Sequence, residues 1–141
     1  MNNSQVLFEI IGQIARRRYL AAEQCFSALN LNHTEARLLS LLRQAGGAAT
    51  QDALAGQLII DRSNTGRSLK HLEQLGCILR RIQPGDKRAN QVRLTRKGSK
   101  TAIAIDRFRR KMAQDFFGNL TDAEAGAVVN LLGKAFPEYL P

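Results

Sequence analysis

Cysteine and histidine are scarce in this sequence of 141 residues, which contains two of each and no tryptophan. Cys25 and Cys77 lie far apart, without the Cys-x-x-Cys or Cys/His spacing of a zinc site or a disulfide framework. His33 and His71 belong to no Ser/His/Asp order, and the P-loop and G-x-G-x-x-G motifs are absent. We therefore expect no metal, no cofactor and no enzyme, and we expect the protein in a reducing cytoplasm.

Long apolar runs are also missing, and none approaches the ~18 consecutive apolar residues that cross a bilayer. The stretch Val6–Ala15 is interrupted by Glu9 and Gln13, and the cluster Arg16–Arg18 follows it, whereas a signal peptide places its charges first. With 44% hydrophobic and 23% charged residues, the composition is that of a soluble globular protein without a membrane partner. The length fits a single domain, residues 1–141.

Acidic residues are rare in one segment, Arg62–Lys100, which holds eleven basic residues and two acidic ones, Glu73 and Asp86. This segment therefore carries the whole net charge of +9, and the rest of the chain is neutral. Basic residues near phosphates release condensed counterions, so a charge excess confined to one stretch indicates a surface that binds a polyanion. The alternative is a solvated basic face without a partner.

Apolar residues at helical spacing predict a long first helix from Val6 toward Phe26. Thr34 is predicted as the N-cap of a second helix, since its hydroxyl can accept a hydrogen bond from an amide of the next turn. The pair Gly46-Gly47 is predicted to end this second helix. Thr50 is then predicted to cap a short third helix. The apolar residues of the third helix are Leu54, Ala55 and Leu58.

A fourth helix is predicted from Arg62 to Leu75, with Asp61 or Ser63 as its N-cap. Gly76 is predicted to end it, because glycine adopts a positive φ without steric penalty. The inward face of this helix carries Leu69, Leu72 and Leu75.

The periodicity of the sequence changes after the fourth helix. Residues 77–82 and 90–94 are short, partly alternating stretches separated by the strong turn signal Pro84-Gly85-Asp86, and they predict a two-stranded hairpin. Thr95 is predicted to cap a long fifth helix, and the capping box Thr121-x-x-Glu124 to open a last one. The expected fold is mainly α with a small β-hairpin. Two short helices followed by a basic hairpin form a winged helix-turn-helix.

In a helix-turn-helix, the second helix enters the major groove of DNA with its N-terminal residues at the base edges. Here this is the fourth helix, and its candidate DNA contacts are Arg62, Ser63, Asn64, Thr65, Arg67, Ser68 and Lys70. Arg67 has the chemistry to pair with guanine and Asn64 with adenine. His71 is expected to contact a phosphate or to be exposed. Gly66 either permits close approach to DNA or is a neutral surface glycine. Four further basic residues are better suited to contact phosphates than base edges, namely Arg80, Arg81, Lys87 and Lys97.

Several short motifs lie along residues 31–100. The first are Leu31-x-x-Thr34, Leu54-Ala55-x-x-Leu58-x-Ile60-Asp61-Arg62-Ser63, Leu72-Glu73-x-Leu75-Gly76 and Arg80-Arg81. The most specific pair is a wing tip, Asp86-Lys87-Arg88-Ala89, followed by a helix start, Leu94-Thr95-x-x-Gly98. With these motifs the sequence resembles the MarR family of bacterial transcription regulators, in which such a pair at this separation is typical. The resemblance covers residues 31–100 at the level of motifs and nearly the whole chain by element order.

This resemblance implies a homodimer, in which residues 1–30 and 101–141 form dimerisation helices and residues 31–100 form the winged DNA-binding region. Two recognition helices would then meet a pseudo-palindromic operator in double-stranded DNA. The resemblance also implies that Asp86 fixes Arg88 by an ion pair and that Arg88 reaches into the minor groove.

Members of the family commonly bind small aromatic or anionic molecules between the dimerisation helices and the winged region, which weakens DNA binding. By resemblance, the candidate ligand contacts here are Arg16, Arg17, Tyr19, His33 and Arg37, against the alternative of a solvated or inter-subunit face. Some relatives sense peroxides through a cysteine, so a redox-sensing role of either cysteine stays open. The expected function is a repressor that a ligand releases from DNA, since most members of the family repress rather than activate transcription.

Other functions fit the sequence less well. A winged-helix module that binds RNA is disfavoured, because the aromatic residues on which RNA bases stack are absent from Arg62–Lys100. An acidic protein is a further alternative partner for the basic hairpin. The alternative to the dimer is a monomer whose terminal helices fold back on the winged module.

Overall fold

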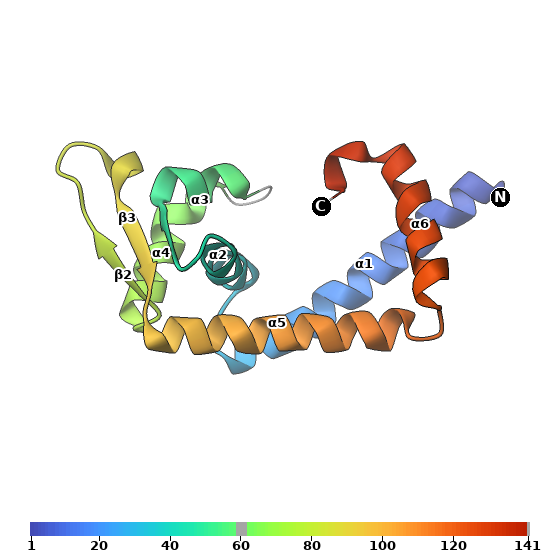
Figure 1. The fold of residues 1–141 in the computed structure, drawn as a ribbon, viewed down its shortest axis with the longest axis horizontal. Helices are drawn as coiled ribbons and strands as arrows, with labels where there is room; N and C mark the ends of the chain where they lie inside the picture. The colour runs from blue at the N-terminus through green and yellow to red at the C-terminus, as the bar shows by residue number, and fades with distance from the viewer. Residues whose placement is uncertain (59–61, 141) are drawn as a thin grey trace. The chain divides into compact units, whose positions relative to one another are not determined.

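The computed structural model describes residues 1–58 and 62–140, and its contacts divide the chain into two units, Met1–Phe108 and Arg109–Pro141 (Figure 1). The first unit contains α1 (Asn3–Ala28), α2 (His33–Gln44), β1 (Ala48–Thr50), α3 (Gln51–Gln57), α4 (Thr65–Gln74), β2 (Ile78–Arg81), β3 (Gln91–Leu94) and the start of α5 (Arg96–Phe117). The second unit contains the end of α5, then α6 (Asp122–Ala135). Short 3-10 turns lie at Arg62–Asn64, Lys87–Ala89 and Pro137–Tyr139. The predicted fold class, mainly α with a small β wing, is confirmed.

Helix α2 begins with a cap that the sequence analysis misplaced. Its N-cap is Asn32, whose side chain accepts the amide of Glu35 at 2.8 Å, while the Glu35 carboxylate accepts the amide of Asn32 at 3.1 Å. This reciprocal capping box satisfies two amides that helix geometry leaves without partners. The prediction of Thr34 as the cap was therefore wrong, because only Asn32 has a glutamate three residues later.

The two helices of the helix-turn-helix start in different ways. The hydroxyl of Thr50 accepts the amide of Ala53 at 3.1 Å, which confirms Thr50 as the cap of α3. Helix α4 instead follows a 3-10 turn, and its N-cap residue Asn64 makes no side-chain cap hydrogen bond. Ser63 was predicted as this cap but lies within the 3-10 turn, and the alternative, Asp61, lies outside the described residues.

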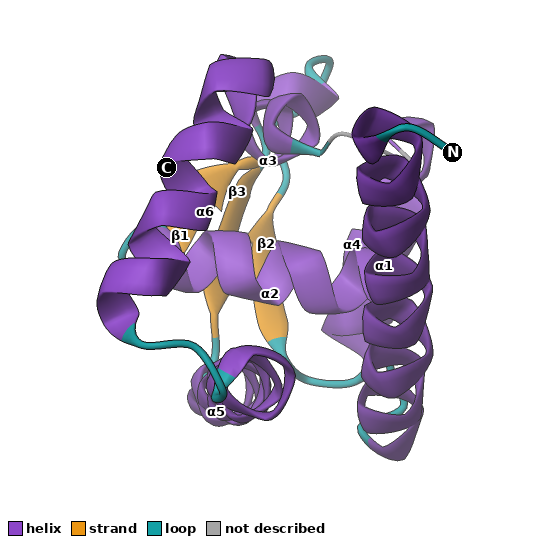
Figure 2. Cartoon of the chain, turned by 90° about the vertical axis from the view of Figure 1, so that its right-hand side faces the viewer, coloured by secondary structure: helices purple, strands orange, loops and turns teal. Residues whose placement is uncertain are grey.

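The predicted hairpin is part of a three-stranded antiparallel sheet in the order β1-β3-β2. Strand β2 pairs with β3 in a register that places Ile78 opposite Leu94, and β1 pairs along the other edge of β3. Strand β1 was not predicted, because its three residues, Ala48, Ala49 and Thr50, are too few to show an alternating pattern. Figure 2 shows α2 lying across the strands of this sheet.

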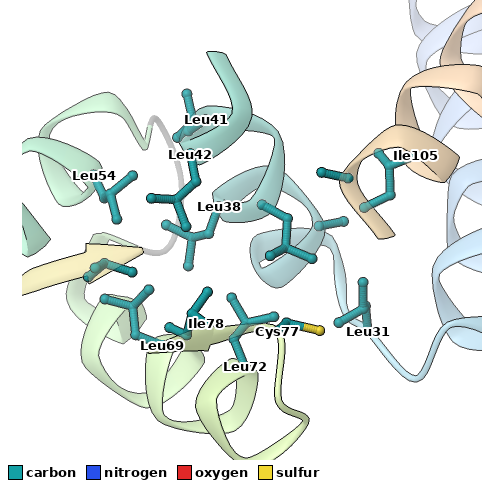
Figure 3. Close-up of a cluster of buried hydrophobic side chains, with 14 of the residues drawn as sticks. Leu31, Leu38, Leu41, Leu42, Leu54, Leu69, Leu72, Cys77, Ile78 and Ile105 are labelled. Atoms are coloured by element: carbon teal, nitrogen blue, oxygen red, sulfur yellow. The ribbon is translucent and has the colours of Figure 1, made fainter. Parts of the chain in front are cut away.

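Buried aliphatic side chains from seven elements and two connecting segments form the core of the first unit. Figure 3 shows leucines of α2, α3 and α4 converging on Ile78 of β2, with Ile105 of α5 at one side. The side chains with no exposed surface include Leu38, Leu39, Leu42, Leu54, Leu69, Leu72, Ile78, Val92 and Ile105. Because α4 and the wing both pack on α2, this core sets where their outer faces point.

The junction between the wing and α5 explains the spacing of the Leu94-Thr95-x-x-Gly98 motif. The hydroxyl of Thr95 accepts the amide of Gly98 at 3.0 Å, which confirms Thr95 as a cap, and it donates to the carbonyl of Gly76 at 2.6 Å. A Cβ at Gly98 would overlap the carbonyl oxygen of Cys77. Glycine is therefore needed for α5 to start against the segment that leaves α4. Gly76 itself has the predicted positive φ, +76°.

The second unit is built around α6. The hydroxyl of Thr121 accepts the amide of Glu124 at 3.2 Å, as the predicted N-terminal cap requires. The turn after α6 brings Leu140 back against Gly133, where an added Cβ would lie 2.7 Å from the side chain of Leu140. Among the described residues, no helix is both long enough and apolar enough to span a membrane.

Candidate nucleic-acid interface

The sequence-predicted contacts at the start of α4 divide into an outer and an inner set. Arg62, Ser63, Arg67 and Lys70 are exposed, and Asn64 is half-buried. Thr65 and Ser68 are buried, with 3% and 6% of their surface exposed. These two side chains therefore face the core and have almost no surface for DNA.

The burial of Thr65 and Ser68 follows from helical geometry. Counted from Thr65, Ser68, Leu69 and Leu72 stand at i+3, i+4 and i+7, the spacing of a single helix face. Since both leucines are fully buried, the two hydroxyl residues share their inward direction. The hydroxyl of Thr65 donates to the carbonyl of Arg62 at 2.7 Å, which joins the 3-10 turn to the helix. The leucine spacing contained this signal, and the sequence analysis missed it.

The tip of the wing holds Arg88 through Asp86. The Asp86 carboxylate accepts the amide of Arg88 at 3.1 Å, and its Oδ1 lies 3.5 Å from Nε of the same residue. The side chain of Arg88 is nevertheless 81% exposed. The pair thus limits the directions that Arg88 can take and leaves its guanidinium free to meet a partner. The side chain of Lys87, a further predicted contact, lies outside the described part of the chain.

Asn90 is a structural residue of the wing that the sequence analysis did not identify. Its side chain is buried and accepts the amide of Gln83 at 2.8 Å, which closes the loop at the wing tip. Its backbone carbonyl accepts the amide of Gln51, the first residue of α3, also at 2.8 Å. Asn90 therefore links the wing to the helix-turn-helix.

Three polar contacts hold the last turn of α4, and they change the role of three predicted phosphate-binding residues. Arg80 is only 15% exposed and pairs with Glu73 at 3.0 Å, so the prediction of a phosphate contact was wrong for it. Nζ of Lys97 donates to the carbonyl of Leu75 at the C-terminal end of α4, where a cation offsets the helix dipole. The ring of His71 contacts the buried carboxylate of Glu35.

His71 was expected to contact a phosphate or to be exposed. Its side chain is 41% exposed, as expected, and it also contacts an acidic residue of α2. The contact joins Nδ1 of His71 to Oε2 of Glu35, and Glu35 is 3% exposed. Its partner lies 36 residues earlier in the chain, beyond the reach of any local pattern. Of the other predicted phosphate contacts, Arg81 is exposed on β2.

The residues considered for ligand binding form one aromatic contact and one open hollow. The ring of Tyr19 stacks on His33 with centroids 4.0 Å apart, and Phe26 meets His33 edge-on at 5.3 Å. Arg16 and Arg17 line a hollow of about 430 Å³ on α1, which is open to solvent. Arg37 is exposed one turn after His33 on α2.

Neither cysteine has the setting of a reactive thiolate. Cys77 is 2% exposed and belongs to the core, as a small apolar side chain does. Cys25 is partly buried, and burial raises the pKa of its thiol above the usual value, so the thiol stays protonated at neutral pH. A redox sensor needs the opposite shift. Among the described residues, no group of three or more His, Cys, Asp or Glu side chains is placed to hold a metal ion.

The winged region of this chain is similar to a known protein family. The model of the MarR family matches residues 31–89. A proposed transcriptional regulatory protein for the hcr operon of Thauera aromatica is 32% identical over 87 residues. That match covers 62% of this chain and 52% of the relative, so the chain spans about half the length of this curated relative.

Solved structures share the fold over nearly the whole chain. The organohalide-sensing transcriptional regulator RdhR, crystallised with bound 2,4-dichlorophenol, has a TM-score of 0.78 at 19% identity, covering 100% of this chain and 83% of its own. The reduced form of MarR from E. coli has a TM-score of 0.73 at 26% identity, and the match covers 93% of this chain and 96% of MarR. A mutant of the same protein in complex with operator DNA has a TM-score of 0.74 at 24% identity, with 93% and 94% covered.

Proposed function

We propose that this chain is a member of the MarR family and a homodimeric transcription regulator that binds a pseudo-palindromic operator in double-stranded DNA. The support is the similarity of residues 31–89 to the family and the fold shared with MarR from E. coli. The observation that carries this proposal is the exposed start of α4 beside a wing that presents Arg88. Arg62, Arg67 and Lys70 point outward from the helix, while the inward leucines of the same helix fix it to the core. In this proposal, residues 31–100 form the DNA-binding region and act in the bacterial cytoplasm.

The roles of the DNA contacts follow from the chemistry of the exposed side chains. Arg67 and the half-buried Asn64 read base edges in the major groove, where arginine pairs with guanine and asparagine with adenine. Arg88 enters the minor groove, whose narrow stretches attract a guanidinium. Arg81 contacts phosphates, which position the protein without reading the sequence.

Exposed apolar side chains at both ends of the chain support a dimer. Residues 1–30 and 101–141 would supply the interface, because a monomer that leaves so much apolar surface in water is disfavoured. On α1 the exposed residues are Val6, Leu7, Phe8, Ile10, Ile11, Tyr19 and Leu20. In the second unit they are Phe117, Leu120, Val128, Val129, Leu131, Phe136, Tyr139 and Leu140. A two-fold axis would set the two α4 helices about one turn of DNA apart, ~34–36 Å.

A small aromatic or anionic ligand completes the proposal as the signal that releases a repressor from its operator. The support is the Tyr19–His33 stack at the start of α2, in which Nε2 of His33 is buried without a hydrogen-bond partner among the described residues. A polar group of a ligand would satisfy that nitrogen. Arg16 and Arg37 would attract an anionic group from the exposed faces of α1 and α2.

The test is selection from a pool of random duplex DNA, without added ligand, with the wild-type protein, Arg88→Ala and the control Arg37→Ala, at several salt concentrations. Arg37 is exposed on α2, outside both the basic segment and the proposed dimerisation helices. We expect an inverted repeat to be enriched by the wild type and the control. Arg88→Ala should weaken binding and reduce the salt slope by about 1. Binding without any enriched sequence, unchanged in Arg88→Ala, would refute the proposal and favour an RNA or acidic protein partner.

A further inference from the structure

A buried carboxylate of α2 holds the recognition helix α4 by a directional contact. Glu35 stands in the first turn of α2, where Oε1 accepts the amide of Asn32 at 3.1 Å. Its second oxygen, Oε2, contacts Nδ1 of His71 on α4. One side chain thus caps α2 and ties α4 to that cap.

The position of His71 on α4 makes this contact relevant to DNA. Arg67 and Lys70 are the two exposed cations of the outer face. His71 directly follows Lys70 and lies one helical turn after Arg67. Leu69 and Leu72, on either side of His71 in the sequence, have no exposed surface. These leucines fix the helix to the core, but the hydrophobic effect that buries them has no preferred direction of its own. A hydrogen bond to a charged group is directional and opposes a rotation of the helix about its axis.

We infer that Glu35 and His71 are positioning residues for operator recognition, because their contact fixes the angle at which α4 presents Arg67 and Lys70. The inference rests on the proposed function. Base readout requires donors placed at the base edges, whereas phosphate attraction tolerates small changes of angle. The contact therefore raises the preference for the operator over other DNA and leaves general affinity for DNA nearly unchanged.

The experiment is a double-mutant cycle of Glu35→Gln and His71→Ala. Glutamine at position 35 removes the charge but still serves in a capping box, so α2 keeps its start. The matched control is Arg43→Gln, which breaks the ion pair of Arg43 with Asp106 between α2 and α5 and does not involve α4. For each variant, Kd is measured on the duplex selected by the wild type and on a scrambled duplex of equal length, over a range of salt concentrations. Urea unfolding of each variant is measured alongside.

In each single variant, the ratio of the affinity for the selected duplex to that for the scrambled duplex should fall about tenfold. In the double variant this ratio should fall no further than in either single variant. Binding to the scrambled duplex and the salt slope should stay as in the wild type. His71→Lys, whose ammonium can donate to the Glu35 carboxylate, should recover most of the lost preference. Arg43→Gln should lower the unfolding midpoint and leave the preference unchanged, which separates positioning from a general loss of stability.

Different results separate this inference from the proposed function. If the wild type selects no duplex, the proposed function fails and the inference fails with it. If the wild type selects a duplex and both single variants keep its full preference, only the inference is overturned. If His71→Ala weakens binding to both duplexes and lowers the salt slope while Glu35→Gln does neither, His71 is a phosphate contact and the inference is wrong.

Discussion

Replacement of Gly98 by alanine should strongly destabilise the protein, although alanine is the better helix former. A Cβ at this position would lie 2.8 Å from the carbonyl carbon of Cys77, whereas carbon atoms in contact are usually about 3.5–4.0 Å apart. The obstacle is backbone, so no side-chain rotation relieves it. The start of α5 must move away and strain the hydrogen bond from the Thr95 amide to the Cys77 carbonyl, now 3.0 Å.

The expected size follows from three contributions. Overpacking costs about 1–3 kcal/mol and here belongs at the upper end. Weakened hydrogen bonds at Thr95 add about 1 kcal/mol, and the higher helix propensity of alanine returns up to about 1 kcal/mol. We therefore expect Gly98→Ala to lower the free energy of unfolding by about 3 kcal/mol.

The assay is urea unfolding followed by circular dichroism, at one protein concentration because the stability of the proposed dimer would depend on it. The matched control is Gly66→Ala in α4, where an added Cβ would meet only Nε2 of Gln51 at an ordinary 3.5 Å. The free energy of unfolding of this control should rise by up to about 1 kcal/mol, because alanine has a higher helix propensity than glycine. A midpoint of Gly98→Ala equal to that of the wild type, or an equal loss in both variants, would show that the close approach at Gly98 does not govern stability.

Two further predictions concern the caps and the thiols. Asn32→Ala removes one half of the capping box of α2 and should lower the free energy of unfolding by about 1 kcal/mol in the same urea assay; an unchanged midpoint would contradict the capping argument. Because burial raises the pKa of the Cys25 thiol, alkylation of Cys25 by iodoacetamide should reach half of its maximal rate at a higher pH than alkylation of free cysteine. Peptide mapping after timed labelling measures this rate, and fast labelling at neutral pH would reopen the redox-sensing alternative.

Local patterns were sufficient where a structure depends on neighbours in the chain. The apolar spacing of α1, the cap at Thr50 and the turn Pro84-Gly85-Asp86 each involve residues within one or two turns of each other, and all three predictions are confirmed. The errors at Thr34 and Ser63 arose where several good capping residues stand side by side. In such a run, the reciprocal partner three residues later decides the cap, as it does for Asn32 and Glu35.

The candidate site was less readable than the fold. Seven polar residues were predicted as DNA contacts of the recognition helix, with no distinction between its inner and outer faces. In the structure, Thr65 and Ser68 lie on the inner face. Arg80 and His71 were also predicted as phosphate contacts. In the structure Arg80 pairs with Glu73 and His71 contacts Glu35, so both side chains help to hold α4.

The sequence by itself determined the order of the elements, the winged helix-turn-helix and the location of the excess positive charge. These depend on periodicity, turn residues and composition, which are properties of short segments. Only the tertiary structure decided which cations face solvent, that Asn90 joins the wing to α3 and that Glu35 meets His71. The physical reason is that a charge finds its partner through the packing of the core, and that packing brings together residues far apart in the chain.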